Sequence, residues 1–524
     1  MAPVAFPDMF PTPIASAEQL APRPEATGST RLSELAVLVG ARPVHGTVSG
    51  VTLRTQDVRP GDLFAALPGA RAHGADFAAQ AHRRGAAALL TDPAGAARPA
   101  VIDSGLPVLV TPDPRSVLGV LAARVYGDPT ARLCVLGVTG TSGKTTVTFL
   151  IEAGLRAAGL SSGLIGTVRT TIDGQRWASS LTTPEAPDLQ ALFAIMLERG
   201  VGHAAMEVSS HALSLHRADG TRFAVGAFTN LSQDHLDFHH DMESYFAAKS
   251  LLFDGRAVSE VVNTDDAWGR RLLRAGTVSV SAAGRADAGW RAEDVAAAPD
   301  GGQRFTAVTP DGVRVPVGLP LPGSYNVANA LLALACLDRA GVPASSAAQG
   351  LAEVNVPGRL ERVEVGQPYL ALVDYAHKPA AVAALLETVR PRVRPGGRLI
   401  VVLGCGGDRD AAKRPLMGAE AARRAELLVI TDDNPRGEPP SAIRAAMRAG
   451  ALAAPPLGEV LEVGDRRDAI TAAVARARAG DVLVVAGKGH ETGQEAHGVR
   501  RPFSDVDELT GAIHAELAGS GAAR

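Results

Sequence analysis

The fold of this chain is decided by residues 131–159, which read ARLCVLGVTGTSGKTTVTFLIEAGLRAAG. The apolar run VLGV predicts a buried strand, and apolar residues three or four positions apart predict an amphipathic helix that ends at Gly159. The glycines between strand and helix let backbone N–H groups face phosphate oxygens at a helix N-terminus. Lys144 would neutralise phosphate charge, and the Thr145 hydroxyl could bind Mg²⁺. This order of strand, loop and helix predicts an ATP-binding α/β domain.

Length and composition place this domain in a larger globular protein. The chain has 524 residues, which predicts about three domains of roughly 150 residues each. The 52 basic and 55 acidic residues nearly cancel, so we expect no nucleic-acid partner and no anionic membrane partner.

The three cysteines are too few for a disulfide framework, and no apolar run approaches the ~20 residues of a membrane span. The start of the chain has neither the basic nor the apolar region of a signal peptide. We therefore expect a cytoplasmic monomer.

The pattern along the chain predicts a lead-in segment and three α/β domains. Residues 1–29 are rich in proline at their start, and we expect them to be disordered. Residues 30–128 alternate short strands with helices, and residues 129–357 contain the phosphate loop. In residues 358–524, four apolar strands each end in polar residues, namely in YLALVDYAH, RLIVVLGCGGDRD, ELLVITDDNPR and DVLVVAGKGHE. Such runs are typical of a parallel sheet that binds its ligand at the carboxyl ends of its strands.

Several further motifs occur in a fixed order along the chain. They are TTP at 182–184, MEVSSHAL at 206–213, TNLSQDHLDFH at 229–239, AAK ending at Lys249, GSYNVANAL at 323–331, PGRLE at 357–361 and DYAHKP at 374–379. With the loop TGTSGKTT, this set resembles the ATP-dependent Mur ligases of peptidoglycan synthesis over nearly the whole chain after the lead-in. The resemblance implies an N-terminal UDP-binding domain, a central P-loop ATPase domain and a C-terminal Rossmann-like domain.

The resemblance implies roles for residues of the phosphate loop and of the segments around it. The ATP-binding residues would be Gly140, Thr141, Ser142, Gly143, Lys144, Thr145 and Thr146, joined across the interdomain cleft by Asn329, Arg359 and Asp374. The catalytic residues would be Lys144, Glu207, His235 and Lys249. Mg²⁺ would be held by Thr145, Glu207, His235 and a carbamate on Lys249. Other readings are a solvated acid for Glu207, a structural histidine for His235, a helix cap for Asn329 and a linker charge for Arg359.

The chemistry of amide-bond formation agrees with these roles. A carboxylate is a poor electrophile, so ATP must first convert it to an acyl phosphate, which a neutral amine then attacks. Both steps build negative charge that cations must hold. In the predicted helix DMESYFAAKSLLFDG, capped by Asp241, Lys249 shares an apolar face with Tyr245, Leu252 and Phe253. An amine among apolar groups loses its charge more readily and can then add CO₂. The alternative is a lysine whose stem packs while its ammonium reaches water.

The third predicted domain would select the incoming amino acid. Asp433-Asn434-Pro435-Arg436 follows a strand directly and resembles the signature of the branch that adds meso-diaminopimelate. The side chain of diaminopimelate ends in a carboxylate beside an ammonium, whereas that of lysine ends in a bare ammonium, so a fixed guanidinium attracts the first and repels the second. Arg409 is a second candidate for that carboxylate. Glu491 and the Gly487 carbonyl would bind the ammonium.

The UDP-linked substrate would contact the first two predicted domains. By the resemblance, its ligands are Leu53, Thr55, Thr182, Thr183, Ser209 and Arg217. This chain has Arg54-Thr55-Gln56 where many relatives have Asp-Ser-Arg, but the Thr55 hydroxyl can still bind a phosphate or uracil oxygen.

The predicted function is therefore ATP-dependent and Mg²⁺-dependent addition of meso-diaminopimelate to UDP-N-acetylmuramoyl-L-alanyl-D-glutamate. One alternative keeps the chemistry but changes the substrate, as in a lysine-adding or folylpolyglutamate-type ligase. Another is a P-loop nucleotide switch that ligates nothing. The DNPR string and the domain before the phosphate loop favour the diaminopimelate ligase over the first alternative, and the four polar strand ends favour it over the second.

Overall fold

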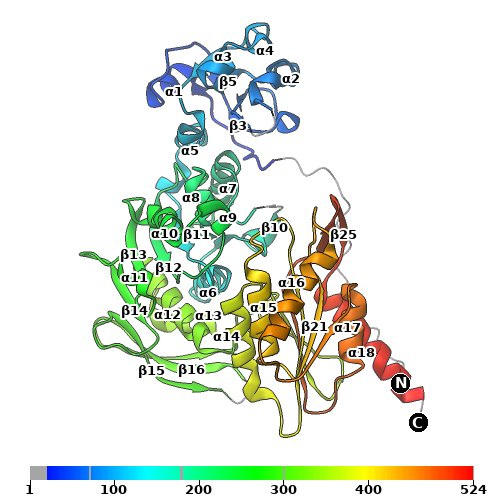
Figure 1. Ribbon diagram of the computed structural model, residues 1–524. Coiled ribbons are helices and arrows are strands. Elements are labelled where there is room, and N and C mark those ends of the chain that lie inside the picture. Colours follow the sequence, from blue (N-terminus) through cyan, green and yellow to red (C-terminus); the bar gives the residue numbers. More distant parts are fainter. Residues whose placement is uncertain (1–20, 70–71, 178–180, 299–300, 523–524) are drawn as a thin grey trace, which may run out of the picture.

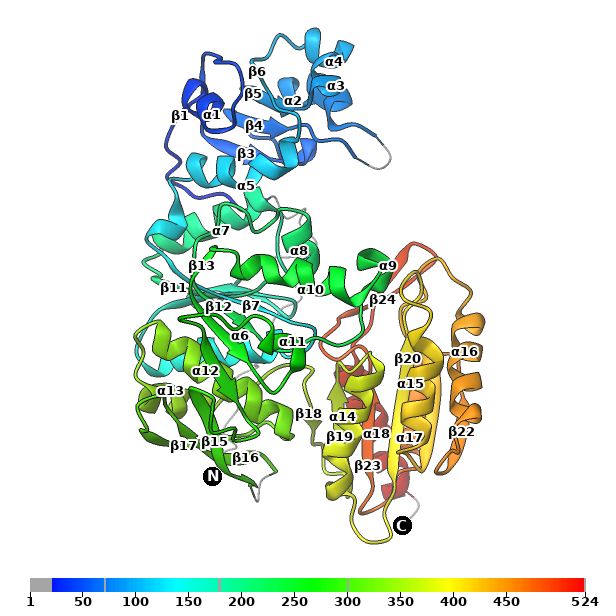
Figure 2. The same cartoon turned by 60° about the vertical axis from the view of Figure 1, so that its left-hand side comes forward.

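The computed structural model describes residues 21–69, 72–177, 181–298 and 301–522. Three large sheets of four, eleven and six strands follow one another along this part of the chain, each covered by helices, and two two-stranded sheets accompany them (Figure 1). Figure 2 shows the N-terminal domain at one end of the central domain and the C-terminal domain beside the central one. The predicted fold of three α/β domains is confirmed, while the predicted boundaries at residues 128 and 357 stay predictions.

The N-terminal domain is built on a parallel sheet with the strand order β3-β4-β5-β6. Its core joins β4 and β5 to α1 and α5 through apolar side chains such as Leu35, Leu63, Leu90 and Leu121. The element bounds are β1 Thr30–Arg31, α1 Leu32–Leu38, β2 Thr47–Val48, β3 Gly50–Thr52, β4 Asp62–Ala65, α2 Ala78–Arg83, β5 Ala88–Thr91, α3 Pro93–Ala96, α4 Pro99–Ile102, β6 Val108–Val110 and α5 Pro114–Val125.

The central domain contains an eleven-stranded sheet in the order β10-β9-β8-β11-β7-β12-β13-β14-β15-β16-β17. The strands from β8 to β15 in this order run parallel, and antiparallel strands extend both edges. Its strands are β7 Cys134–Thr139, β8 Ser162–Ile165, β9 Thr170–Ile172, β10 Gln175–Trp177, β11 His203–Glu207, β12 Phe223–Phe228, β13 Ala257–Asn263, β14 Val278–Ser281, β15 Trp290–Ala297, β16 Gln303–Val308 and β17 Arg314–Leu319. Its helices are α6 Lys144–Ala157, α7 Ala186–Glu198, α8 Ser210–Ser214, α9 Leu236–His239, α10 Met242–Ser250, α11 Ala267–Arg270, α12 Ser324–Arg339 and α13 Ala344–Leu351.

Strand β7 is buried on both faces of this sheet, as its apolar run predicts. Leu136 and Val138 pack with α6 and α12 on one face, whereas Val135 packs with α7 on the other. The apolar side chains of α6 at positions 147, 150, 151 and 155 are all fully buried, and Gly159 follows the helix with a φ of 74°. The strand and the helix therefore fix the phosphate loop between them from both sides.

The C-terminal domain contains a six-stranded sheet in the order β18-β19-β23-β20-β21-β22. Strands β19, β23, β20, β21 and β22 are parallel, so the four polar ends identified in the sequence lie along one edge. Helices α14, α15 and α16 cover one face, and α17 and α18 cover the other. The bounds are β18 Glu361–Val363, β19 Leu370–Asp374, α14 Pro379–Val389, β20 Leu399–Cys405, α15 Lys413–Ala422, β21 Leu427–Asp432, α16 Pro440–Ala453, β22 Glu459–Glu462, α17 Arg466–Val474, β23 Val482–Ala486, β24 Gly493–Ala496, β25 Val499–Pro502 and α18 Asp505–Ala522.

The predicted disordered lead-in of residues 1–29 needs a correction. Residues 1–20 lie outside the described residues, but residues 21–29 make specific contacts. The Arg23 guanidinium donates to the Val51 carbonyl oxygen at 2.9 Å and forms a buried ion pair with Asp62. The backbone N–H groups of Glu25 and Ala26 donate to the Glu198 carboxylate of α7 at 3.0 and 2.7 Å. The prediction failed here because composition does not reveal an ion pair with a carboxylate 39 residues away.

The three cysteines are all free, as expected from their number and spacing. In the described part of the chain, no helix is long and apolar enough to cross a membrane.

A buried ion pair between α17 and α18 generates a stability prediction. Arg466 and Asp505 have fully buried side chains joined by two hydrogen bonds of 2.7 Å, and the same guanidinium donates to the Ala486 carbonyl oxygen. Asp505→Ala would leave this cation without a counter-charge, so we expect the free energy of unfolding of this domain to fall by about 3–5 kcal/mol.

Hydrogen exchange of β21 and β23 in urea measures that loss. The exposed Asp507 lies in the same first turn of α18, so Asp507→Ala should stay within about 0.5 kcal/mol of the wild type. Equal stability of the Asp505→Ala variant and the wild type would contradict the prediction.

Candidate active site

The phosphate loop adopts a conformation that two of its glycines make possible. Gly140 and Gly143 have φ angles of 142° and 90°, in the region that side chains rarely adopt. A Cβ atom at Gly140 would lie 1.9 Å from Thr229 Oγ1, and one at Gly143 would lie 2.5 Å from Asn329 Oδ1. Asn329 lies within α12, so it is not a helix cap. It faces the phosphate loop, the position its predicted role requires.

The half-buried Lys144 and the buried Lys249 donate to the same oxygen of this loop. Lys144 Nζ lies 2.9 Å from the Gly140 carbonyl oxygen and 3.1 Å from that of Thr141. Lys249 Nζ lies 2.8 Å from the Gly140 oxygen. Burial, followed by the nearby Lys378 charge, lowers the pKa of Lys144 to about 8. Burial, followed by the charges of Lys144 and Lys378, lowers the pKa of Lys249 well below its usual value.

Lys249 occupies the apolar setting that its helix predicted. Asp241 caps α10, because its Oδ1 accepts from the Ser244 N–H at 2.7 Å. The Lys249 ammonium lies over the Tyr245 ring at 4.6 Å, and the residue is only 1% exposed. This burial excludes the alternative in which the ammonium reaches water.

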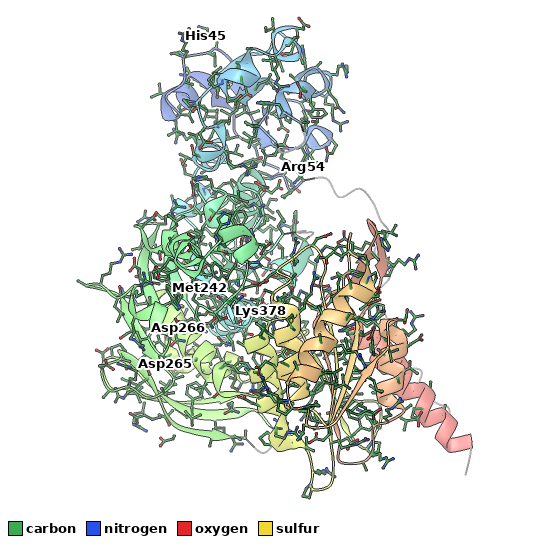
Figure 3. All side chains as sticks on the ribbon, in the orientation of Figure 1. His45, Arg54, Met242, Asp265, Asp266 and Lys378 are labelled. Atoms are coloured by element: carbon green, nitrogen blue, oxygen red, sulfur yellow. The ribbon has the colours of Figure 1, made fainter. Side chains whose placement is uncertain are left out.

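A third lysine reaches the loop from the C-terminal domain. Lys378 Nζ lies 3.2 Å from the Thr141 carbonyl oxygen and 2.8 Å from Asp234 Oδ2. Figure 3 shows Lys378 where the C-terminal domain meets the central domain. The bonds to Gly140 and Thr141 therefore gather three amines from three separate segments of the chain.

Glu207 lies at the end of β11 beside the start of α6. Its Oε1 accepts from the Thr145 hydroxyl at 3.0 Å and from the Thr167 N–H at 2.8 Å, and it is 1% exposed. It is therefore not a solvated acid. The Thr167 hydroxyl also lies 2.9 Å from that of Thr182, and the Thr183 hydroxyl donates to the Glu207 carbonyl oxygen at 2.8 Å. Hydrogen bonds to Glu207 and Thr167 therefore join the TTP segment to the phosphate loop.

His235 lies beside Asp234, the carboxylate that pairs with Lys378. Its Nε2 is 3.0 Å from Asp234 Oδ2, and its ring meets that of His211 edge-on at 4.8 Å. Its φ of 54° is in the left-handed region. Among the residues that the structure describes, no three His, Cys, Asp or Glu side chains are grouped closely enough to hold a metal ion. The joint metal role of Thr145, Glu207, His235 and Lys249 stays a prediction.

The C-terminal domain already contacts the phosphate loop through Arg359. Its guanidinium lies over the Tyr375 ring at 4.5 Å and donates to the Thr145 hydroxyl at 3.4 Å, so it is not a solvated linker charge. Asp374 accepts from the backbone N–H groups of Leu360 and Ala376, each at 2.8 Å, which fixes the end of β19 against the segment that carries Arg359. These bonds hold Asp374 beside Arg359, and the predicted contact of Asp374 with the nucleotide stays a prediction.

The DNPR segment and the GKGHE segment meet at the polar edge of the C-terminal sheet. Lys488 is fully buried, and its Nζ lies 3.0 Å from Asn434 Oδ1, 3.0 Å from Glu491 Oε2 and 3.5 Å from Asp433 Oδ1. Asn434 also donates to Glu491 at 2.8 Å. Gly487 adjoins this group, since a Cβ atom there would lie 2.9 Å from Asp433 Oδ2.

The two arginine candidates, Arg436 and Arg409, lie on neighbouring loops but differ in how firmly contacts with other segments hold them. Arg436 has a φ of 51°, and its guanidinium donates to the Gly407 carbonyl oxygen at 2.7 Å. Its backbone N–H donates to the Glu495 carbonyl oxygen at 3.0 Å. Arg409 is exposed and donates to the carbonyl oxygen of its own neighbour, Asp408, at 3.1 Å. Arg436 is therefore the fixed guanidinium at this edge, with Pro435 beside it.

The candidate UDP-substrate ligands fall into two groups. Ser209 caps α8, accepting from the Ala212 N–H at 3.1 Å, while its own N–H donates to Thr183 Oγ1 at 3.1 Å. Arg217 is paired with Glu185 at 2.9 Å, a carboxylate that Arg115 of the N-terminal domain also contacts. Ser209 thus lies with the TTP segment close to the phosphate loop.

Leu53 and Thr55 lie in the N-terminal domain next to its contact with α7. Leu53 is half-buried against the domain core, and Thr55 begins a short 3₁₀ turn. Arg54 between them forms an ion pair with Asp188 of α7 at 3.0 Å, at the junction of the two domains (Figure 3). Arg54, the neighbour of the predicted ligand Thr55, therefore joins two domains.

Comparison with known proteins identifies the family. Three family models match this chain: "Mur ligase family, catalytic domain" over residues 47–126, "Mur ligase middle domain" over residues 138–337 and "Mur ligase, glutamate ligase domain" over residues 358–489. A protein of Streptomyces avermitilis named UDP-N-acetylmuramoyl-L-alanyl-D-glutamate–2,6-diaminopimelate ligase is 54% identical over 501 residues, covering 94% of this chain and 98% of the relative. The chain belongs to the Mur ligase family.

Other relatives of this Mur ligase carry the same name. The protein of Corynebacterium efficiens is 52% identical over 472 residues, covering 88% of this chain and 89% of the relative. A solved structure of a UDP-N-acetylmuramoyl-L-alanyl-D-glutamate–2,6-diaminopimelate ligase matches with a TM-score of 0.65 at 31% identity, covering 94% of this chain and all of that one.

The structure of this Mur ligase adds site residues that the sequence did not single out. Lys378 and Lys488 lie inside quoted motifs, DYAHKP and GKGHE, but no role was predicted for them. The sequence did contain a signal for both lysines, because a lysine shortly beyond the carboxyl end of a buried parallel strand lies at the ligand edge of the sheet. Thr167 and Asp234 carry no such signal, since only the fold reveals their partners Glu207 and Lys378.

Proposed function

We propose that this Mur ligase joins meso-diaminopimelate to the D-glutamate of UDP-N-acetylmuramoyl-L-alanyl-D-glutamate at the expense of ATP. The observation that carries the proposal is the contact between two sites of different chemistry. A cation-rich phosphate loop lies in the central domain, and the C-terminal domain that touches it carries the charged DNPR and GKGHE groups at its ligand edge. The names of the relatives support the same substrates.

The reaction proceeds in two transfers. An oxygen of the substrate carboxylate bonds to the γ-phosphorus of ATP, and the bond from that phosphorus to the bridging oxygen of ADP breaks. The neutral amine of diaminopimelate then bonds to the acyl carbon, phosphate leaves with the electron pair of its C–O bond, and the amine loses a proton. Lys144 binds phosphate oxygens in both steps, and Arg359 adds charge from the adjoining domain. Close contact between the domains keeps water from the acyl phosphate.

Thr145 and Glu207 fit a magnesium ion. Their hydroxyl and carboxylate oxygens are 3.0 Å apart at the start of α6, and oxygen ligands of this kind suit Mg²⁺, which completes its shell with phosphate and water. When bound, Mg²⁺ would neutralise charge on the phosphate groups of ATP.

We also propose that Lys249 is carbamylated. Its buried amine has a depressed pKa and therefore reacts readily with CO₂, and the product is an anion beside Lys144 and Lys378 that could bind a metal ion. The other proposed ligands of that ion are Thr145, Glu207 and His235.

Removal of CO₂ tests the modification. We expect ligation to fall in bicarbonate-free buffer and to recover when bicarbonate is added, and Lys249→Ala to lower kcat by at least about 10²-fold because the anion is lost. Mass measurement of the Lys249 peptide under non-acidic conditions should show one added CO₂. Lys413→Ala is the control, and full activity of Lys249→Ala would contradict the proposal.

Arg436 is the proposed ligand of the distal carboxylate of diaminopimelate. Glu491, Asp433 and the Gly487 carbonyl would bind the ammonium beside it, with Asn434 and Lys488 holding these groups in place. A lysine substrate would bring its ammonium against the guanidinium instead, which is repulsive.

A competition assay with diaminopimelate and lysine tests this assignment and the proposed function together. We expect strong preference for diaminopimelate in the wild type. Arg436→Ala and Arg436→Lys should each lower kcat/KM for diaminopimelate by about 10²-fold, because an ammonium cannot reproduce two parallel hydrogen bonds.

Arg423→Ala, at a surface ion pair of α15, should behave as the wild type. Arg409→Ala should have the smaller effect. An unchanged preference in both Arg436 variants would rule the assignment out.

A further inference from the structure

We propose that Lys378 is a further catalytic residue, a phosphate-binding lysine that the C-terminal domain supplies to the phosphate loop of the central domain. This inference rests on the proposed function, and it assigns a role in phosphoryl transfer to a residue of the domain that selects the amino acid.

The position of Lys378 carries the proposal. Its Nζ donates to the Thr141 carbonyl oxygen, which also accepts from Lys144, the lysine of the phosphate loop itself. Lys249 donates to the adjacent Gly140 oxygen. The three amine nitrogens therefore surround two consecutive carbonyl oxygens, although their residues lie 105 and 129 positions apart in sequence (249 − 144 and 378 − 249).

The backbone holds Lys378 in this position. It precedes the first residue of α14, Pro379, and its carbonyl oxygen accepts from the Val382 N–H at 2.9 Å. Four residues earlier, Asp374 is fixed by two backbone N–H groups. The side chain is 7% exposed, so its ammonium is committed to the interdomain contact and not to solvent.

Positive charge exceeds negative charge around Lys378 and the phosphate loop, which favours binding of an anion there. Asp234 is the carboxylate that pairs with Lys378, and its Oδ2 lies 2.8 Å from Lys378 Nζ and 3.0 Å from His235 Nε2. Lys144, Lys378 and Arg359 bring three cations to the loop, against the two carboxylates of Asp234 and Glu207. A phosphate group seated on the loop would supply the missing negative charge and take hydrogen bonds from Lys378 that the Thr141 carbonyl now accepts. Asp234 would retain its contact with His235.

A phosphate-binding Lys378 would make acyl-phosphate formation depend on the position of the C-terminal domain. As the γ-phosphoryl group passes from ATP to the substrate carboxylate and ADP leaves, charge spreads over its equatorial oxygens, and a cation fixed beside them lowers the barrier. Two lysines of that set belong to the central domain, whereas Lys378 arrives only with the C-terminal domain. Acyl-phosphate formation is thereby fast only when the domain that binds the amino acid is docked.

Positional isotope exchange in ¹⁸O-labelled ATP measures the first transfer alone, in the presence of the UDP-linked dipeptide and the absence of diaminopimelate. We expect Lys378→Gln to slow this exchange and kcat by about 10²-fold, with KM for diaminopimelate within about threefold of the wild type. Lys378→Arg, which keeps the charge, should recover at least about tenfold of the loss.

Arg390→Gln is the matched control, because Arg390 lies at the other end of the same helix and pairs with Glu426. It should exchange isotope at the wild-type rate. Wild-type exchange in Lys378→Gln, or a loss confined to KM for diaminopimelate, would overturn the proposal. If the wild type itself ligates no diaminopimelate, the proposed function fails instead, which is a separate result.

A second measurement uses the unaltered protein, in case Lys378→Gln does not fold. The chain has five lysines, so selective isotope labelling gives five side-chain NMR signals, assigned through conservative variants. A non-hydrolysable ATP analogue should shift the signals of Lys144 and Lys378 and leave that of Lys413 in place. An unshifted Lys378 signal would overturn the proposal.

Discussion

The active site depends on the crowding of three lysine amines at the phosphate loop, which together with burial lowers the pKa of Lys144 and of Lys249. Lys144, Lys249 and Lys378 all donate to the carbonyl oxygens of Gly140 and Thr141, and Lys249 and Lys378 are buried away from water. This arrangement is costly in the free protein. Phosphate groups relieve the cost, so nucleotide binding and the compact arrangement of the domains stabilise each other.

The domain architecture supplies the members of this site from different sheets. The loop after β7 holds Lys144, α10 holds Lys249, and the end of β19 leads directly to Lys378. Parallel sheets place such groups at the carboxyl ends of their strands, and the central and C-terminal sheets bring these ends together. The N-terminal domain is joined to the central domain by ion pairs at α7, including Arg54 with Asp188.

Local patterns in the sequence were enough to predict most of the framework. The buried faces of β7 and α6, the cap at Asp241 and the parallel strands of the C-terminal sheet all follow from residues close together in the chain. Contacts between distant residues were not predictable in this way. The Lys378 bond to Thr141 spans 237 positions, and Arg23 finds Asp62 only once the first sheet has formed. The resemblance predicted single ligands, but the fold was needed to show that Lys488 contacts Asp433, Asn434 and Glu491 together.

Phosphate release from ATP tests most directly whether ATP, the UDP-linked dipeptide and diaminopimelate react in one site. The measurement omits the UDP-linked dipeptide and diaminopimelate in turn. Because the amine attacks an acyl phosphate that forms only on the dipeptide, we predict sustained release when both are present and little when either is missing. Equal release without the dipeptide would mean that the loop serves hydrolysis or switching, and it would contradict the account given above.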